Sequence, residues 1–527
     1  MNETRQAAVA ALLPEIAQAT VTRRRTRHRL LRALVVLAAV LVVVAIFGGA
    51  WIIEHRHDGL DTQHDTAVTA LAPADLARYR AAAASAPVPA DAPIVLTYHD
   101  INPVGRDSTY VVRPSAFEAQ MRMLHEAGYR SLTADQFAGY VRGSFDPPSH
   151  SVLITFDDGT AGLWVYADRI LARYGFHAVS FVITGRVGTH RPYYLTWPEI
   201  ARLSGTGRWD FESHTHDLHS AVPTGPGTVG SNLSNRLYIN GVLESMDAFR
   251  RRVSGDLQRS VDDLVAHDLP RPQLFAYPFS DIVGKVTDPT TTQFPKDVVA
   301  RLFTASFVDV SPTALPASHR VAAIRMIQRL EVFTHDTDRD IFGEMRQMST
   351  LPVAALDPSA TDADWFEEGG DSAPVRLTPG SVAVDAGSLT YVQANWAPQR
   401  TSDWVGYRAD VTVSGLSEQH DVTGSVRARV GSSGEITVRL AAHEAQIRDS
   451  TGQLIRVLRL ASAPSHHVSI TVREHATVVR VDAGAPVTVS SGGGPLSHGG
   501  IGITVRRAAR TDAFPTFAEL RVAPADG

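Results

Sequence analysis

Apolar runs of strand length alternate with helical patterns between residues 91 and 350. Val152–Phe156 and Ala178–Ile183 are short runs of apolar and β-branched residues, which is typical of buried strands. Between them, apolar residues from Leu163 to Tyr174 recur at helical spacing, and Gly175 supplies a stop signal. A strand, a helix and a second strand within about thirty residues predict a parallel βαβ unit.

The same alternation continues along this part of the chain. Capping boxes at Ser115–Glu118, Thr133–Gln136 and Thr196–Glu199 predict helix starts. Further strand-like runs stand at Leu274–Phe279 and Phe303–Val310. A long helix is predicted by an apolar stripe that consists of Phe249, Val253, Leu257, Val261 and Leu264. So many units in one direction predict an α/β domain at 91–350, either a (β/α) barrel or a doubly wound sheet.

The pattern changes in the last third of the chain. Residues 351–379 are rich in Asp, Ala, Pro and Gly and are interpreted as a linker. From 380 to 527, short alternating runs are separated by Gly, Ser and Asp turns, which predicts an all-β sandwich. Its Gly-rich segment at 490–502 resembles a concanavalin-type or laminin-G-like jelly roll. Its large aromatic residues either fill the core or stack on sugar rings; they are Trp396, Trp404 and Tyr407.

The amino-terminal region predicts a membrane anchor. Arginines cluster in the basic tail at 1–32, and Ala33 to Ile53 then carry no charge. At about 1.5 Å per residue this run spans about 32 Å, enough to cross the hydrocarbon core. A cleaved signal peptide is the alternative, although the run is long and lacks a clear cleavage site. The arginines predict a cytoplasmic amino terminus with the rest of the chain outside, after a linker at 54–90.

Composition limits the chemistry. At 527 residues the chain is long enough for two or three domains. A net charge of -5, from 50 basic and 55 acidic residues, gives no indication of a nucleic-acid binder. Because there is no cysteine, disulfides, thiolate metal sites and cysteine nucleophiles are excluded. Any metal must be held by His, Asp or Glu.

Two adjacent carboxylates follow the predicted strand at 152–156. Asp157 and Asp158 stand where α/β folds place their chemistry, at the carboxyl end of a strand. After another apolar run come three histidines, His214, His216 and His219. One aspartate and two histidines make a three-ligand site with open positions for water and substrate. An Asp-Gly turn beside solvated histidines is the alternative interpretation.

These residues favour a mononuclear metal hydrolase. Asp158, His214 and His219 are the predicted ligands, and Asp157 is the predicted general base. A backbone N–H between Tyr277 and Phe279 would complete an oxyanion hole. A histidine from another strand would protonate the leaving nitrogen.

At these motifs the chain resembles the polysaccharide deacetylases of the NodB-homology type, carbohydrate esterase family four. Thr155–Gly159 matches the family's first motif, in which the first aspartate is the base and the second a metal ligand. Ser213–His219 resembles the second motif, whose two histidines complete the metal site. A spacing of five positions between His214 and His219 resembles the branch that acts on biofilm poly-β-1,6-N-acetylglucosamine. His216 is the competing second ligand.

Two further segments resemble the family's remaining motifs. Phe275–Phe279 resembles the third, whose last aromatic residue lends its N–H to the oxyanion hole, but Ala276 replaces the arginine that orients the base. That role is therefore vacant or filled from elsewhere. Leu96–Asp100 resembles the motif of the catalytic acid and gives that role to His99. His335 is the alternative acid, and Asp309 is a candidate for the fourth motif.

The resemblance implies a distorted (β/α) barrel with fewer than eight regular strands. It also implies a divalent metal, with Zn²⁺ expected first, and hydrolysis of N-acetyl groups on a β-linked aminosugar polymer. The expected protein is a single-pass membrane deacetylase facing the cell exterior, with polysaccharide as substrate and export machinery as a potential partner. The alternatives are deacetylation of chitin-like or peptidoglycan substrates, a catalytically silent glycan-binding scaffold, and a glycoside hydrolase using Asp157 with a second carboxylate.

Overall fold

The computed structural model describes residues 69–84, 92–104, 108–280, 289–309, 316–360, 364–367, 373–417 and 420–525. The basic tail at 1–32 and the predicted membrane span at 33–53 lie outside these ranges. Within them, no helix combines the length and the apolar character that crossing a membrane requires.

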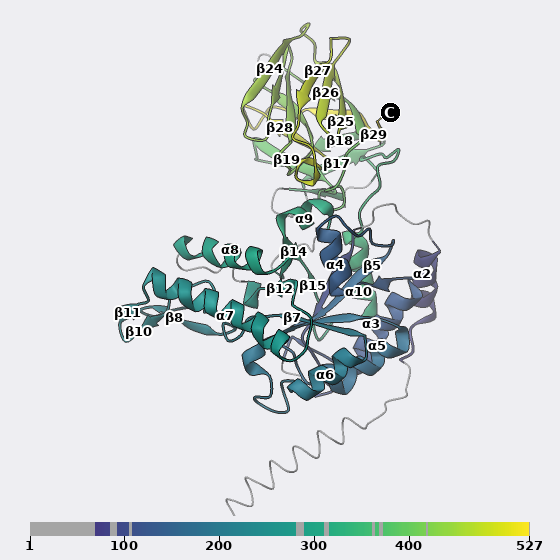
Figure 1. The fold of residues 1–527 in the computed structure, drawn as a ribbon. Coiled ribbons are helices and arrows are strands. Elements are labelled where there is room, and N and C mark those ends of the chain that lie inside the picture. The colour runs from purple at the N-terminus through teal and green to yellow at the C-terminus, as the bar shows by residue number, and fades with distance from the viewer. Residues whose placement is uncertain are drawn as a thin grey trace, which may run out of the picture. The chain divides into compact units, whose positions relative to one another are not determined.

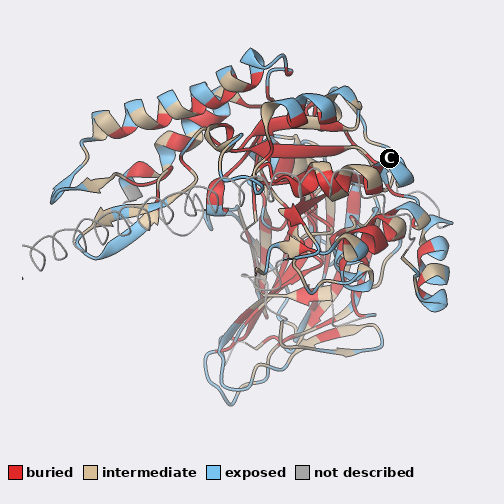
Figure 2. Cartoon of the chain, turned by 90° about the horizontal axis from the view of Figure 1, so that it is seen from below, coloured by how far each residue is buried: buried red, intermediate tan, exposed pale blue. Residues whose placement is uncertain are grey.

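A parallel sheet forms the core of the first half of the described chain (Figure 1). Its strands run in the order β14-β13-β12-β7-β6-β5-β1-β15, with β4 beside β5. Their bounds are β1 (Ile94–Tyr98), β4 (Arg130–Ser131), β5 (Ser151–Phe156), β6 (Ala178–Val182), β7 (Trp209–Ser213), β12 (Leu274–Ala276), β13 (Ala305–Val308), β14 (Met326–Gln328) and β15 (Leu330–Glu331). Figure 2 shows the central strands as buried, which explains why their sequences are continuous apolar runs.

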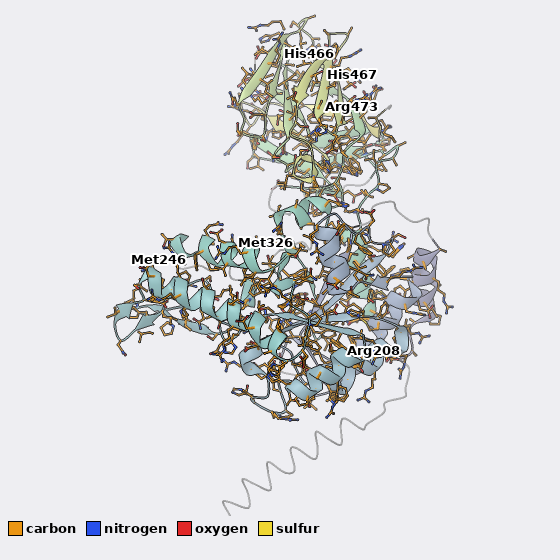
Figure 3. All side chains as sticks on the ribbon, in the orientation of Figure 1. Arg208, Met246, Met326, His466, His467 and Arg473 are labelled. Atoms are coloured by element: carbon orange, nitrogen blue, oxygen red, sulfur yellow. The ribbon has the colours of Figure 1, made fainter. Side chains whose placement is uncertain are left out.

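The two ends of the sheet belong to one interrupted strand. β14, which begins at Met326 (Figure 3), pairs in parallel with β13. After Arg329 the chain continues as β15, which pairs in parallel with β1. The sheet therefore closes into a barrel whose seam is crossed at a single residue. This confirms the predicted distorted barrel, and the alternative of a doubly wound sheet is wrong.

Helices follow the strands and surround the barrel (Figure 1). They are α3 (Pro114–Glu126), α4 (Ala134–Val141), α5 (Asp168–Tyr174), α6 (Trp197–Gly205), α7 (Met246–Ala266), α8 (Gln293–Leu302), α9 (His319–Ile324) and α10 (Asp338–Met348). A π-helical turn at Leu163–Ala167 leads into α5, and Gly175 ends it with φ +71°. The predicted apolar stripe of α7 is buried, as expected.

Short strand pairs lie in the connections between these elements. They are β2 (Asp100–Ile101) with β3 (Val111–Val112), β8 (Ala221–Gly225) with β9 (Thr228–Ser231), and β10 (Tyr238–Ile239) with β11 (Val242–Leu243).

Two of the three predicted capping boxes are confirmed. The Thr133 and Thr196 hydroxyls each accept a hydrogen bond from the backbone N–H of the third residue of their helix, and their own backbone N–H groups donate to the side chains of Gln136 and Glu199. The box predicted at Ser115 is wrong, because α3 begins one residue earlier, at Pro114, after the N-cap Arg113. Glu118 is instead the acceptor for Thr69 and Arg173.

Part of the predicted amino-terminal linker is folded against the barrel. Helix α2 (Pro73–Ala83) buries the ring of Tyr79 completely, and the Tyr79 hydroxyl donates to Asp338 Oδ2 at 2.6 Å. Arg339 donates to Asp75 Oδ2 at 2.7 Å. Helix α2 is thus fixed to α10.

The last part of the chain is all-β, as predicted. One sheet has the order β16-β19-β28-β21-β22-β23-β24 and the other β17-β18-β29-β20-β25-β26-β27. The first sheet comprises β16 (Trp365–Phe366), β19 (Tyr391–Trp396), β28 (Ile501–Arg506), β21 (Thr423–Ala428), β22 (Ile436–Ala441), β23 (Glu444–Arg448) and β24 (Leu454–Arg459). The second comprises β17 (Val375–Thr378), β18 (Ser381–Val384), β29 (Thr516–Pro524), β20 (Tyr407–Ser414), β25 (Ser465–Arg473), β26 (Ala476–Val481) and β27 (Val487–Ser490). β16 and β17 show that the sandwich includes residues from the predicted linker at 351–379.

The inner faces of the two sheets share one hydrophobic core. In β25, His466 is buried and its neighbour His467 is exposed (Figure 3), which is the alternation of a strand with one face inward. Trp396, Trp404 and Tyr407 are at most 4% exposed and contact one another as part of this core. Sugar stacking by these three residues is therefore wrong.

Candidate active site

The carboxyl ends of β5 and β7 carry the predicted metal-binding residues. Asp157 and Asp158 follow β5, and His214 follows β7. Both strands pair with β6 in parallel, so their carboxyl ends meet at the same edge of the barrel. Asp158 takes a φ of +70°, so the chain turns sharply between the two aspartates.

Three side chains converge at this edge. One ligand atom from each of Asp158, His214 and His219 lies within 4.8 Å of the other two. His219 Nε2 is 3.4 Å and His214 Nε2 is 3.7 Å from Asp158 Oδ1. When each ligand atom lies about 2.1 Å from a tetrahedrally coordinated ion, two ligand atoms are about 3.4 Å from each other. The observed separations therefore fit a single cation such as Zn²⁺.

The environment of His214 prepares it for metal binding. Its Nδ1–H donates to the carbonyl oxygen of Ala276 at 2.8 Å, which leaves Nε2 as the free lone pair facing Asp158. Burial lowers the pKa of His214 to about 4, although Asp157 partly opposes this effect. The imidazole is therefore neutral at physiological pH, as a metal ligand must be.

Asp158 provides a second indication of a cation site. Its Oδ1 atom is buried and has no hydrogen-bond partner among the described residues. A buried carboxylate oxygen without a partner is costly. A metal ion at the centre of the cluster would satisfy it, so the donor set fits the expected divalent ion.

His216, the alternative ligand, does not join this cluster. Its Nδ1 lies 2.7 Å from Asp263 Oδ2 on α7 and 3.0 Å from the Thr184 hydroxyl. Its backbone N–H donates to Asp256. His216 therefore fixes the loop after β7 to helix α7, and the hypothesis that it binds the metal is wrong.

Arg329 occupies the centre of the site, and sequence reasoning missed it. Its guanidinium donates to both carboxylate oxygens of Asp157 at 2.7 Å, and to both of Asp309 at 2.7 and 2.8 Å. The Arg329 side chain is 0% exposed, and its Cζ packs over the neighbouring rings of Phe181 and Phe307, at 5.5 and 5.8 Å from their centroids. Arg329 thus fills the orienting role left open by Ala276, and it connects the fourth-motif candidate Asp309 to the site.

The ion pair with Arg329 determines the charge of Asp157. Burial by itself raises the pKa of the Asp157 carboxyl, but the positive charge of Arg329 outweighs burial, with further help from His214 and His99. The pKa of Asp157 is consequently held below its usual range. The carboxylate is ionised at neutral pH and lies 3.8 Å (Oδ2) from His214 Nε2, so it is adjacent to the metal cluster.

The two candidates for the acid differ in position. His99 follows β1, and its buried Nδ1 has no hydrogen-bond partner within the described part of the chain. His99 also influences the ionisation of Asp157, so it faces the site. His335 is 74% exposed and lies 3.5 Å from Asp336. The geometry favours His99.

The two predicted oxyanion donors also separate. The Tyr277 N–H donates to the carbonyl of Phe307 at 3.0 Å, so it is occupied by the barrel sheet and is not available to substrate. Phe279, with φ +55°, turns the chain toward the site, and its ring centroid is 4.4 Å from that of His219. Of the two predicted donors, the Phe279 N–H stays the candidate.

Glu331 adds an acidic group that the sequence did not single out. It pairs with Thr97 across the barrel seam, and Thr97 in turn donates to Asp309. Burial and then the negative charge of Asp309 raise the pKa of Glu331 to about 7. The site therefore contains a carboxyl group that titrates near neutral pH.

Comparison with known proteins gives a family for this segment. Residues 145–292 match the family model described as Polysaccharide deacetylase, which confirms the resemblance predicted from the motifs. The matched segment contains Asp157, Asp158, His214 and His219. Both His99 and Arg329 lie outside it.

Curated relatives carry one name. A poly-beta-1,6-N-acetyl-D-glucosamine N-deacetylase of Staphylococcus aureus is 33% identical over 174 residues, which is 32% of this chain and 54% of the relative. The protein of that name from Staphylococcus epidermidis is 28% identical over 209 residues, 39% of this chain and 65% of the relative. The chain thus spans between about half and two thirds of the length of these relatives.

Among solved structures, a de-N-acetylase from Aggregatibacter actinomycetemcomitans is similar to this chain with a TM-score of 0.41 and 19% sequence identity. The match covers 48% of this chain and 98% of the de-N-acetylase chain. IcaB from Ammonifex degensii has a TM-score of 0.38 and 21% identity, and covers 49% of this chain and 99% of its own.

Proposed function

We propose that this chain, whose residues 145–292 match the polysaccharide deacetylases, is a metal-dependent polysaccharide N-deacetylase. The proposed reaction is hydrolysis of the N-acetyl groups of a β-linked N-acetylglucosamine polymer, which releases acetate and leaves free amines. The observation that carries the proposal is the convergence of Asp158, His214 and His219 beside an ionised, buried Asp157.

The metal site is proposed at Asp158, His214 and His219. A carboxylate and two neutral imidazoles suit Zn²⁺, which we propose as the native ion. A divalent cation held there would polarise the acetamide carbonyl and lower the pKa of a bound water molecule. The remaining chemistry belongs to protein side chains.

Asp157 and His99 are the proposed proton carriers. Asp157, ionised and fixed by two hydrogen bonds from Arg329, accepts the proton of the attacking water. The Phe279 N–H would stabilise the negative charge that develops on the carbonyl oxygen. His99 donates a proton to the leaving nitrogen, so the C–N bond breaks with a neutral amine as product.

The substrate is proposed to be poly-β-1,6-N-acetylglucosamine. Support comes from the names of the staphylococcal relatives and from the five-residue spacing of His214 and His219. Chitin-like and peptidoglycan substrates, which carry the same acetamide on β-1,4 linkages, are the alternatives.

A membrane location is a further part of the proposal. The uncharged run from Ala33 to Ile53 after an arginine cluster supports a single span with the catalytic domain outside. An extracellular polymer and its synthesis and export machinery would then be within reach. Deleting 33–53 should move the protein from the membrane to the soluble fraction after cell lysis.

The two rival functions lose support at the site. A silent glycan-binding scaffold was favoured by the missing arginine at Ala276, but Arg329 holds the base instead. A glycoside hydrolase needs two carboxyl groups on opposite sides of a glycosidic bond. Asp157 and Asp309 are joined by one guanidinium, so they do not form such a pair.

Acetate release by the full-length protein tests the proposal. We expect acetate from β-1,6-linked N-acetylglucosamine oligomers, less from β-1,4-linked ones, and none after treatment with a chelator until Zn²⁺ is restored. Asp157→Asn should lower kcat at least about 100-fold. Asp217→Asn is the matched control, because Asp217 lies in the second motif, between His214 and His219, but is 60% exposed and paired with Arg186.

Acetate release that persists in chelator would remove the metal mechanism. Absence of acetate from every acetylated glycan would favour the scaffold.

A further inference from the structure

A row of aromatic rings leads from the proposed acid to the protein surface. The ring centroids of His99 and Tyr110 are 4.7 Å apart, and those of Tyr110 and Phe333 are 5.9 Å apart. Phe333 and His335 follow at 6.1 Å, with their rings almost parallel at 4°. We call these four residues the aromatic track.

The aromatic track is open to solvent at Tyr110 and His335 and half-buried at His99 and Phe333. Tyr110 is 46% exposed. Burial and the negative charges of Glu331 and Asp309 nevertheless raise the pKa of its phenol, so its ring reaches down to the carboxylates of the site. His335, at the outer end, has a side chain that is 74% exposed. Aromatic residues whose role is to fill a core would be buried, as Phe181 and Phe307 are.

The backbone holds the aromatic track in place. The Thr334 N–H donates to the Thr109 carbonyl at 2.8 Å, and the Thr334 hydroxyl donates to the Ser108 carbonyl at 2.9 Å. The Phe333 N–H donates to Asp336 Oδ2 at 2.7 Å. The two Thr334 bonds join the segment before β3 to the segment after β15, so the backbone that carries the rings is held together before any ligand binds.

We propose that the aromatic track binds the sugars that lie beyond the reacting residue, so that the enzyme prefers internal residues of a chain to short oligomers. Pyranose rings present apolar C–H faces that pack on aromatic rings. Successive centroids are separated by about the dimension of one such ring, and the track begins at the proposed acid. The inference rests on the proposed function, because the occupant it names is that function's substrate.

Removing one ring tests the proposal in the full-length protein. Phe333→Leu keeps an apolar side chain but removes the aromatic face. For a soluble β-1,6-linked pentamer of N-acetylglucosamine we expect KM to rise about fivefold with kcat unchanged. For the dimer, kcat/KM should change less than about twofold. Phe333→Tyr, which keeps a ring, should behave as wild type.

Tyr391→Leu is the matched control for a general loss of surface aromatic area. Tyr391 is 54% exposed but lies on β19 of the sandwich, so this variant should leave pentamer kinetics unchanged. Equal losses on dimer and pentamer in Phe333→Leu, or no loss on either, would overturn the aromatic track.

The track and the proposed function can fail separately. If the wild-type protein releases no acetate, pentamer binding is measured directly by calorimetry in wild type and Phe333→Leu. Binding about fivefold weaker in the variant would support the track without the reaction. Equal binding, or none, would overturn it.

Discussion

At the scale of single residues, the ion pair between Asp157 and Arg329 determines whether the proposed base can act. A general base must be ionised before it accepts a proton. Burial opposes that charge, and the guanidinium outweighs burial because it contacts both carboxylate oxygens at 2.7 Å. The same guanidinium also pairs with the partly buried Asp309, so one cation is shared by two carboxylates.

Arg329→Met should be strongly destabilising. It keeps an unbranched side chain but removes the guanidinium, so the buried Asp157 and the partly buried Asp309 lose their partner. Removing one partner of a buried ion pair costs about 3–5 kcal/mol. We expect the free energy of unfolding, measured by urea titration, to fall by about that amount. We also expect kcat/KM for acetate release to fall at least about 100-fold.

Two variants serve as controls for Arg329. Arg329→Lys keeps the charge but cannot make the paired contacts, so activity should still fall while stability falls less. Arg208, labelled in Figure 3, forms a partly buried pair with Asp168 at 2.9 Å outside the active site. Arg208→Met should lower stability and leave kcat unchanged. Wild-type stability in Arg329→Met would contradict the pairing.

Glu331 should give the protein a stability that falls with pH. Its pKa is about 7 in the folded protein, whereas the ordinary value is 4.5. Between these values the folded state holds a proton that the unfolded chain has released. The free energy of unfolding therefore decreases as pH rises across that window and is flat above it.

Glu331→Gln removes this titration. From about pH 5 to about pH 8, wild type should lose about 1 kcal/mol relative to the variant, after discounting for solvent screening of a half-buried group. Chemical denaturation of both proteins at the two pH values measures the difference. Identical pH dependence in the two proteins would show that Glu331 titrates normally.

At the scale of elements, the sequence predicted what is local to one strand end. A buried parallel strand is a continuous apolar run, and this pattern predicts β5 and β6. Because β5 and β7 both pair with β6 in parallel, the polar residues that follow β5 and β7 meet at the same edge of the sheet. Arg329 could not be found this way, because it lies 172 positions from Asp157 and only barrel closure brings them together. The capping box predicted at Ser115 is wrong for a similar reason, because Glu118 accepts hydrogen bonds from Thr69 and Arg173, which are distant in the sequence.

The turn after β5 depends on a residue without a side chain. A Cβ added at Gly162 would clash with Asp100 Oδ1 and the Ile101 carbonyl. Gly162→Ala should therefore lower the free energy of unfolding by about 1–3 kcal/mol. Gly255, inside α7, has open space around it, so Gly255→Ala should raise the same quantity by about 0.5–1 kcal/mol. Urea titration of both variants measures the contrast, and equal effects would contradict the clash.

At the scale of the whole molecule, metal binding should be linked to the stability of the barrel. The proposed ligands come from the end of β5 and the loop after β7, so the site exists only in the folded state. Free Zn²⁺ at 100 times its Kd should raise the free energy of unfolding by about 2.7 kcal/mol. The barrel transition in calorimetry should shift upward with Zn²⁺ in wild type but not in Asp158→Asn. A shift of equal size in that variant would mean that zinc binds elsewhere.

The interrupted strand at the barrel seam has a consequence for quality control. Residues 326–328 pair with β13 and residues 330–331 pair with β1. The residue between them is Arg329, whose positive charge keeps Asp157 ionised. A chain that has every ligand in position but has not closed its last strand would therefore be inert. Activity would thus serve as a readout of barrel closure.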